Sequence, residues 1–498
     1  MVVRTLRRHR RALRALGGGV GALLLTNCSR ASSPSAAPRA ASYRATAADV
    51  ALADTVAERT FRWFWETTPA ETGLVHDRYP KLDFSSVASI GFGLTAYGIG
   101  AERGWITRTQ AAERTLTTLR YLWQLPQGPA ATGVSGFHGF FYHFLNYTDG
   151  SRFKTVELST IDTSLLLMGA LFAQSYYDGD GATERTIRAY ADSLYRRVEW
   201  PWIMPRPPRV SMGWHPEKGF IQADWAGYNE AMLLYVLALG SPTHAIGPEA
   251  WTAWTSTYKW RTYRGQPHVN FSPLFGHQYS HAWIDFRGIR DAYMRGRGID
   301  YFENARRATY SQRAYAIANP GGFTGYDSLT WGLTACDGPA DTTVTINGRT
   351  VRLRTYWARG VSANADMDGD TEERDDGTIA PTAAIGSVAF APEIVLPTMR
   401  TMRERYGRII FDRYGFRDAF NPSLRDPALR TQQGTVDREL GWVGRDYLGI
   451  DQGPILLMLE NWRSDFVWSV MRRNVYIVRG LRRAGFAGGW LDTSPLGR

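Results

Sequence analysis

Apolar residues recur at helical spacing along almost the whole chain from Asp49 onward. Residues three and four apart share one face of a helix, so this spacing predicts amphipathic helices, and loops rich in Gly, Pro and aromatic residues separate them. Thr107-Arg-Thr-Gln110 adds a capping box where the third helix should begin, and Pro126 closes that helix. The predicted helices span residues 47–66, 84–104, 107–125, 158–178, 181–198, 225–239, 247–258, 280–294, 298–318, 381–403, 452–463 and 465–484.

One segment alternates apolar and polar residues as a strand would, from Thr343 to Arg354. Asn347-Gly348 interrupts it, and Asn-Gly favours the type I′ turn of a tight hairpin, so we predict an inserted hairpin near residues 343–354. The helices show no 34-residue repeat, which argues against a helical solenoid. Small residues from Ser89 to Gly100 would let helix backbones approach closely, as in the inner ring of an α/α toroid or in the core of another bundle. We therefore predict an all-α fold, with the toroid preferred.

The first 28 residues have the order of a secretory signal. Arginines come first, then the apolar stretch Ala15 to Leu25, which is too short to span a bilayer. Leu25-Thr26-Asn27-Cys28 resembles a bacterial lipobox, although Asn27 departs from the usual small residue, and this predicts lipidation of Cys28. Residues 29–46, rich in Ser, Ala and Pro, predict a flexible tether. We expect an exported lipoprotein, periplasmic or at the outer membrane, that meets the membrane only through its lipid anchor.

The formal net charge of +11 does not indicate a nucleic-acid-binding protein. Six arginines within the first 27 residues, which carry no acid, leave +5 for the remainder, and the chain has only four lysines. Scattered arginine does not form the basic stripe that follows a phosphate backbone. With Cys28 lipidated, Cys336 is the only other cysteine, so packing rather than a disulfide framework must hold the fold.

The chain contains 18 Trp, 25 Tyr and 22 Phe residues, and many of them lie beside Asp, Glu, His or Arg in connecting segments. This composition is typical of sugar binding, because pyranose rings stack on aromatic planes while their hydroxyls need polar partners, although a large helical core also contains many aromatics. The densest stretch runs from Trp225 through Tyr228 and Glu230 to Tyr235. A carboxyl group beside Trp and Tyr loses hydration, which raises its pKa and predicts Glu230 as a general acid. The alternative is a charged carboxylate at a helix N-terminus.

Three further constellations carry candidate chemistry. Glu157 and Asp162 precede an apolar helix, where Asp162 could cap the helix, bind substrate or do both. His281 and Asp285 lie one turn apart, and a hydrogen-bonded pair is preferred over a metal site because no third ligand is evident. Asp446 and Asp451 lie on a turn before a helix, where one of them could activate water, as glycoside hydrolysis by an acid and a base requires.

A calcium loop is the one metal motif. Asn364, Asp366, Asp368, Asp370, Glu372 and Asp375 place oxygen ligands at alternating positions around Gly369, although an EF-hand would close with glutamate. A solvated acidic loop is the alternative. The sequence contains no P-loop, no His-Glu-x-x-His, no dinucleotide-binding glycine motif between a strand and a helix, and no Gly-x-Ser-x-Gly after a predicted strand.

Seven ordered motifs resemble the bacterial glucoamylase-like proteins that include endo-β-1,2-glucanases, over roughly residues 47–485. The motifs are Glu71-Thr-Gly-Leu-Val-His-Asp-Arg78, Glu157-Leu-Ser-Thr-Ile-Asp162-Thr, Tyr228-Asn-Glu-Ala-Met232 with Leu239-Gly-Ser-Pro242, Ser280-His-Ala-Trp-Ile-Asp-Phe-Arg287, Gly325-Tyr326 with Trp331-Gly-Leu-Thr-Ala335, Asp376-Gly-Thr-Ile-Ala-Pro381 and Ile450-Asp-Gln-Gly-Pro454.

The resemblance implies an (α/α)6 barrel over residues 47–498, export, and hydrolysis of a β-linked glucan, most specifically β-1,2-glucan, with no organic cofactor. It also implies Glu230 as the central acid and Asp162, Glu157 and Asp451 as cleft carboxylates. We expect inversion with Asp451 or Asp446 assisting water, in a monomer. Sugar contacts are predicted for Trp225, Tyr228, Trp283, Trp331 and Arg287, together with Glu157, Asp162, His281 and Asp285.

Two other functions fit the same features. A glycan-binding lipoprotein that delivers oligosaccharide to a transporter would also need the signal, the tether and the aromatics, but not turnover. A polysaccharide lyase can share the toroid fold, but it acts on uronates and typically needs a cationic cleft with a Tyr or His base. The concentration of acids beside aromatics is more than binding requires, and the family resemblance favours hydrolysis over both alternatives.

Overall fold

The computed structural model describes residues 43–365 and 371–495. The chain divides into two units, Met1–Tyr43 and Arg44–Arg498, and all the elements described below belong to the second. The predicted signal, Cys28 and most of the tether lie outside the described residues. Within the described ranges, no helix combines the length and the apolarity needed to cross a membrane.

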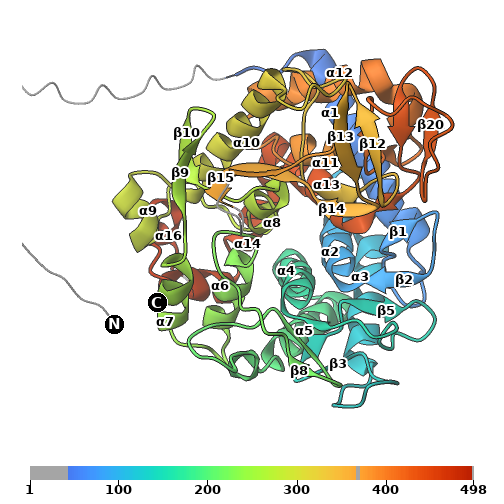
Figure 1. The fold of residues 1–498 in the computed structure, drawn as a ribbon. Coiled ribbons are helices and arrows are strands. Elements are labelled where there is room, and N and C mark those ends of the chain that lie inside the picture. Colours follow the sequence, from blue (N-terminus) through green and yellow to red (C-terminus); the bar gives the residue numbers. More distant parts are fainter. Residues whose placement is uncertain (1–42, 366–370, 496–498) are drawn as a thin grey trace, which may run out of the picture. The chain divides into compact units, whose positions relative to one another are not determined.

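Six helices are buried on almost every side, and they carry the core (Figure 1). Along this set, α2 packs on α4, α4 on α6, α6 on α8, α8 on α13, α13 on α11 and α13 again on α2. The two inner helices not yet linked, α8 and α11, are joined by Gln278, which directly precedes α8. Its side chain donates a 2.8 Å hydrogen bond to the Ala383 carbonyl of α11. These inner helices are α2 (Val87–Glu102), α4 (Thr160–Tyr176), α6 (Met232–Gly240), α8 (Tyr279–Trp283), α11 (Pro381–Ile385) and α13 (Gly449–Ser464).

The other helices lie outside this inner set, and several of them, such as α1, α3 and α5, are amphipathic and pack on it. The N-terminal helix α1 packs on α13, α12 and α2, so segments from both ends of the chain lie together, while α3 and α5 cover α2 and α4. An apolar face with a polar reverse is what such a covering position requires. These helices are α1 (Ala47–Thr67), α3 (Arg108–Gln124), α5 (Ala182–Arg196), α7 (Glu249–Thr255), α9 (Ala292–Arg297), α10 (Tyr301–Ala318), α12 (Pro392–Ile410), α14 (Phe466–Met471), α15 (Val475–Arg483) and α16 (Gly489–Thr493).

Glycines allow α2 and α4 to touch backbone to backbone. A Cβ atom on Gly91 would lie 2.1 Å from the Leu165 carbonyl oxygen, and one on Gly169 would lie 2.1 Å from the Gly91 oxygen. Both distances are far below van der Waals contact, so only glycine fits at these two positions. The small residues of the segment 89–100 therefore have the packing role that the sequence predicted.

The predicted helix-rich fold is confirmed, but the expectation of a single hairpin was wrong, because the loops between helices form many short antiparallel strands. Within the described ranges no sheet has more than three strands. Strands of two or three residues carry too little alternation to be recognised in a sequence. They are β1 (Arg78–Tyr79), β2 (Phe84–Ser86), β3 (Gly136–Phe137), β4 (Phe140–Phe141), β5 (Phe144–Asn146), β6 (Leu158–Ser159), β7 (Gly213–His215), β8 (Gly219–Phe220), β9 (Trp260–Tyr263), β10 (Gln266–Val269), β11 (Ala335–Asp337), β12 (Thr342–Ile346), β13 (Arg349–Leu353), β14 (Tyr356–Ala358), β15 (Gly360–Ala365), β16 (Thr371–Arg374), β17 (Phe411–Asp412), β18 (Gly415–Phe416), β19 (Phe420–Asn421), β20 (Thr435–Asp437), β21 (Gly441–Val443) and β22 (Tyr447–Leu448).

Local signals in the sequence are confirmed where they were specific. Strands β12 and β13 pair around Asn347 and Gly348, whose φ angles of 50° and 77° are those of a type I′ turn. The Thr107 and Gln110 side chains form the predicted capping box at the start of α3. Three predicted helices are instead interrupted: residues 280–294 contain α8, a loop and α9, residues 381–403 contain α11 and most of α12, and residues 465–484 contain α14 and α15.

Candidate active site

The N-terminal ends of several inner helices meet at one group of carboxylates, which we call the acidic cluster. Asp162 lies in the first turn of α4, Glu230 directly precedes α6, and Asp451 lies in the first turn of α13. Tyr279 is the first residue of α8, which packs against both α6 and α13. Burial raises the pKa of the Tyr279 hydroxyl most, and the charges of Asp451, Glu230 and Asp162 raise it further. The complete acidic cluster is Asp77, Glu157, Asp162, Glu230, Asp337, Asp418, Asp446 and Asp451.

Glu230 has the environment of a general acid. It lies in the turn between Tyr228 and α6, and its Oε2 atom is buried without a hydrogen-bond partner. Burial raises the pKa of its carboxyl to about 7, and the neighbouring Asp162 carboxylate adds to the shift. A carboxyl with this pKa keeps its proton on a substantial fraction of molecules at neutral pH and can donate it to a leaving oxygen.

His143 sits between Glu157 and Asp162 as a positive centre. Its Nδ1 is 2.8 Å from Glu157 Oε1, and its Nε2 is 3.6 Å from Asp162 Oδ2. Burial opposes the charged ring, but the two carboxylates outweigh burial and raise the pKa of His143 to about 9. The imidazolium therefore keeps both carboxylates in place beside Glu230. Asp162 does not cap α4, as was one sequence interpretation; Ser159 is the N-cap and binds the Asp162 carboxylate.

Asp337, Asp418 and Asp451 form a coupled group of buried acids. Each is at most 3% exposed, and the Asp337 backbone N–H donates to Asp418 Oδ2 at 2.7 Å. Burial raises the pKa of all three carboxyls, and their mutual repulsion raises it further for Asp337 and Asp451. Since adjacent carboxyls cannot all ionise together, the group holds protons and ionised oxygens side by side near neutral pH. It can therefore accept a proton from water.

Arg78 joins Asp77, Asp337 and Asp446 at one end of the acidic cluster. Its guanidinium lies 3.1, 3.0 and 3.3 Å from these three carboxylates. Beside this arginine opens a polar cavity of about 510 Å³, large enough for a sugar unit. The lining residues are Arg78, Pro80, Lys81, Thr431, Gln432, Gln433, Gly434, Arg445 and Asp446.

A second cavity, of about 380 Å³, is lined in part by the loop that precedes α6. Tyr228, two residues before the acid, lines it together with Lys259, Asn270, Phe271 and Asn364. Of the predicted sugar contacts, Glu157 and Asp162 belong to the acidic cluster. Tyr228 is 2% exposed and packs against Tyr258, His277 and Tyr301, so its ring offers no free face to a sugar.

Three predicted tryptophan platforms are instead parts of the core. Trp225, Trp283 and Trp331 are 5%, 0% and 0% exposed. Each indole N–H donates to a threonine hydroxyl, from Trp225 to Thr160, from Trp283 to Thr95 and from Trp331 to Thr398. A ring enclosed in this way offers no free face to a sugar, so the prediction of substrate contact was wrong for all three.

The predicted pair of His281 and Asp285 does not form. His281 is packed among Phe286, Phe302 and Phe390 with neither ring nitrogen bonded, and burial lowers its pKa to about 3. Asp285 lies beyond the end of α8, where Arg287 and Arg472 neutralise it. Arg287 also bridges to Asp465 and stacks on Trp468. These residues tie α8 to α14, which leaves no role for them in sugar binding.

Of the predicted calcium ligands, Asn364 lies on β15 and Asp375 directly follows β16. Asp366, Asp368 and Asp370 lie outside the described residues, as does the side chain of Glu372. The pairing of Gly360 with Arg374 and of Ala365 with Thr371 separates Asn364 from Asp375 along the hairpin. Asp375 accepts hydrogen bonds from Tyr315 and Tyr326. Among the described residues, no group of three or more His, Cys, Asp or Glu side chains could hold a metal ion.

Sequence reasoning missed five residues of the site. Asp77 and Arg78 belong to a motif that carried the resemblance, so their role could have been suspected. His143, Asp337 and Asp418 are far apart in the sequence, and only the fold brings them together. His143 and Asp418 lie beside aromatic residues in loops, a signal too frequent in this chain to be specific, and Asp337 has no such signal.

The match to known families agrees with this site. The model of the family described as "Putative glucoamylase" matches residues 222–475, about half of the chain and including both Glu230 and Asp451. The chain belongs to the glucoamylase-like family. A solved structure of a glucoamylase-like protein from Bacteroides uniformis is 30% identical and has a TM-score of 0.74, covering 90% of this chain and all of the other.

Two further relatives carry names with a specific linkage. An endo-β-1,2-glucanase from Chitinophaga pinensis, solved with sophorotriose and glucose, is 27% identical with a TM-score of 0.74, covering 90% of this chain and all of that one. An exo β-1,2-glucooligosaccharide sophorohydrolase from Parabacteroides distasonis is 28% identical over 472 residues. That alignment covers 87% of this chain, but the chain spans only 58% of the length of this relative.

Proposed function

We propose that this protein is an exported glycoside hydrolase that cleaves β-1,2-glucan. The observation that carries the proposal is a protonatable Glu230 with a buried Oε2, in the same cluster as a group of interacting buried carboxyls, with a sugar-sized cavity beside Arg78 and Asp446. Hydrolysis of a glycosidic bond needs such an acid together with a proton acceptor. The names of the relatives from Chitinophaga and Parabacteroides support the β-1,2 linkage.

In this mechanism Glu230 gives its proton to the glycosidic oxygen as the bond to the anomeric carbon breaks. Water attacks that carbon from the opposite face and loses a proton to Asp451 or, through the cluster, to Asp446. Burial and Asp418 hold the pKa of Asp451 well above its usual range, whereas the hydrogen bond from Asp451 lowers the pKa of Asp418, so Asp451 would accept the proton from water as it passes its own proton to Asp418. His143 lowers the pKa of Glu157 and so favours its ionised form, which can accept hydrogen bonds from sugar hydroxyls.

The same proposal includes architecture and location. The succession of contacts α2–α4–α6–α8–α11–α13–α2 supports an (α/α)6 barrel with these six helices as the inner ring. The signal-like residues 1–28 with Cys28 support attachment to a membrane through lipid, and residues 29–46 support a tether to the catalytic unit. We expect the catalytic unit to be a monomer.

The test is the release of reducing ends from linear β-1,2-glucan by the purified protein, with product sizing. Parallel reactions with β-1,3-, β-1,4- and α-1,4-glucans establish the linkage, and the E230Q variant establishes the site. Oligosaccharides from β-1,2-glucan alone, absent with E230Q, are the expected result. An unsaturated product that absorbs in the ultraviolet would indicate a lyase instead, and binding without turnover would indicate a glycan-capture protein.

A further inference from the structure

Tyr356 is an aromatic residue that neither the sequence motifs nor the proposed mechanism uses. It opens strand β14, which pairs with β11 so that Tyr356 stands directly opposite Asp337, and Trp357 opposite Cys336. Directly opposed residues of an antiparallel pair project to the same face of the ladder, and their neighbours project to the other. Tyr356 therefore shares a face with Asp337, whose carboxylate is bound by Arg78 in the acidic cluster.

The Tyr356 side chain is largely open to solvent, on a strand that pairs with the strand of Asp337. Tyr356 is 55% exposed, the largest exposed fraction among the exposed large hydrophobic residues of the described ranges. Removal of its hydroxyl from bulk water raises the pKa of that group, and Asp451, Asp418 and Asp77 raise it further. Its hydroxyl also raises the pKa of Tyr279, as do the carboxylates of Asp451 and Glu230. An exposed ring on the face of the ladder that carries Asp337 is available to a ligand bound at the acidic cluster.

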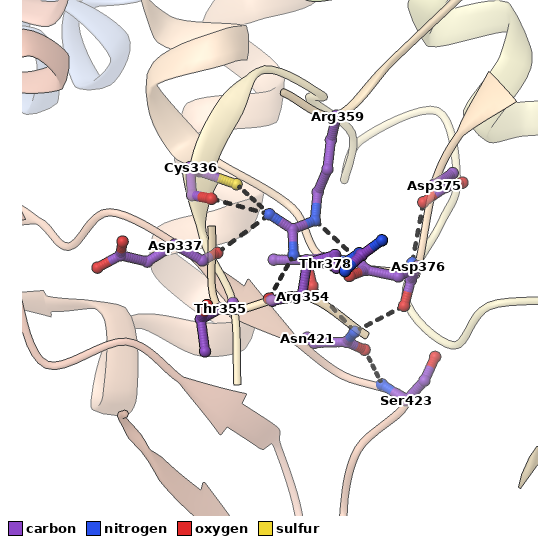
Figure 2. A network of polar contacts seen from close by, with 12 residues as sticks. Cys336, Asp337, Arg354, Thr355, Arg359, Asp375, Asp376, Thr378, Asn421 and Ser423 are labelled. Atoms are coloured by element: carbon purple, nitrogen blue, oxygen red, sulfur yellow. Dashed lines mark hydrogen bonds and ion pairs between the residues drawn. The ribbon is translucent and has the colours of Figure 1, made fainter. Parts of the chain in front are cut away.

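The main chain on both sides of Tyr356 is fixed by buried polar contacts. Arg359, three residues later, is fully buried and pairs with Asp376 through bonds of 2.7 and 2.8 Å. Its guanidinium also donates to the carbonyls of Cys336, Asp337 and Arg354 at 2.9, 3.3 and 3.2 Å. Figure 2 shows this network, with the Asp337 carboxylate pointing away from Arg359.

The preceding residue is held as firmly. The Thr355 carbonyl accepts hydrogen bonds from the Gly338 N–H at 2.7 Å and from the Gln433 side chain at 2.7 Å. An exposed aromatic ring on such a rigid support loses little conformational entropy when a ligand covers it, because its backbone is already ordered. A ring with no ligand to cover would gain nothing from this support.

We propose that Tyr356 is the aromatic platform for a glucosyl unit beside the acidic cluster, on the side of Asp451 and Asp337. The apolar C–H face of the sugar would lie on the ring, and the sugar hydroxyls would meet the surrounding carboxylates. This inference rests on the proposed hydrolysis of β-1,2-glucan. It adds the segment from β11 to β14 to the substrate site.

Three variants test the platform: Y356A removes the ring, Y356F keeps the ring without the hydroxyl, and W123A removes a 40% exposed aromatic from α3, away from the site. On β-1,2-glucan, Y356A should lower kcat/KM at least tenfold, mainly through a higher KM. Y356F should stay within threefold of wild type, and W123A should match wild type. Unchanged melting temperatures would show that all three variants are folded.

Calorimetric titration of a β-1,2-gluco-oligosaccharide separates this inference from the function on which it rests. Binding to E230Q that weakens at least tenfold in the E230Q/Y356A double variant supports the platform, even if wild type shows no turnover. Equal binding by both, or a Y356A variant within twofold of wild type in kcat/KM, overturns the platform and leaves hydrolysis intact. Neither binding nor turnover by wild type overturns the proposed function and the platform together.

Discussion

At the scale of single residues, the chemistry of this site comes from how the fold removes carboxyls from water. Glu230 illustrates the cost of that arrangement. Its Oε2 has no partner, and its raised pKa means that ionising it in the folded protein is unfavourable. Ionisation of Glu230 should therefore lower the free energy of unfolding.

The E230Q variant should therefore lose activity and gain stability at alkaline pH. Loss of the acid should lower kcat at least 100-fold, the usual contribution of a positioned general acid. Because the folded pKa of Glu230 lies above its unfolded value, its contribution to stability is full below pH 4.5 and disappears as pH rises through about 7. The difference in free energy of unfolding between variant and wild type should thus grow by about 3 kcal/mol between pH 4.5 and 8.5.

Urea denaturation at the two pH values measures that difference. The exposed Glu113 on α3 provides the control, since E113Q changes a carboxylate already in water and should alter neither stability nor activity. A constant difference between E230Q and wild type across this pH range would show that Glu230 is not desolvated in the folded protein.

The pH dependence of kcat/KM should show an alkaline limb close to pH 7. Glu230 must hold its proton to act as the acid, and that proton is lost as pH rises through about 7. His143 keeps its charge until about pH 9, so its titration does not produce this limb. Initial rates on β-1,2-glucan from pH 4 to 10, with circular dichroism over the same range to exclude unfolding, give the profile. A limb near 9 would point to His143 rather than Glu230.

At the scale of elements, periodicity and local caps were enough to predict most helices. The Thr107 capping box and the Asn347-Gly348 turn are determined by neighbours within a few residues, so they appear in the structure as predicted. Breaks such as the one between α8 and α9 depend on Asp285 meeting Arg472 from another helix, which no local pattern reveals. The tryptophans were misassigned for the same reason, because burial is decided by elements distant in sequence.

The contact between α2 and α4 gives a prediction for stability. Replacing Gly169 with Ala places a methyl group 2.1 Å from the Gly91 carbonyl, which must separate two fully buried helices. We expect a loss of about 3 kcal/mol in the free energy of unfolding, or failure to accumulate folded protein. Thermal and urea denaturation measure the effect.

The matched control is Gly296, which is exposed in α9 with open space where its Cβ would lie. G296A should stabilise the protein by about 0.5–1 kcal/mol, since alanine favours a helix over glycine by that amount. If G169A proved as stable as G296A, the backbones of α2 and α4 would not be in contact.

At the scale of the whole molecule, the site exists only because distant segments converge. Arg78 lies on β1, Asp337 on β11 and Asp451 on α13, and these elements are far apart in the sequence. Each helix that contributes an acid is itself buried on nearly every side, so the acids cannot easily move apart. Such a framework sets the separation between proton donor and acceptor, which decides the stereochemical course of hydrolysis.

We expect cleavage with inversion at the anomeric carbon. Glu230 lies just before α6, and Asp451 lies in the first turn of α13. Helix α8 packs against both α6 and α13. Carboxyls separated by an intervening helix leave room for a water molecule, as the separation of about 6.5–9.5 Å in inverting enzymes requires, whereas a retaining pair lies at about 5 Å. Proton NMR recorded within the first minutes of β-1,2-glucan cleavage should show the new reducing end as the α anomer before mutarotation. An initial β anomer would mean that a carboxylate attacks the sugar directly, and the acid–base pair proposed here would be wrong.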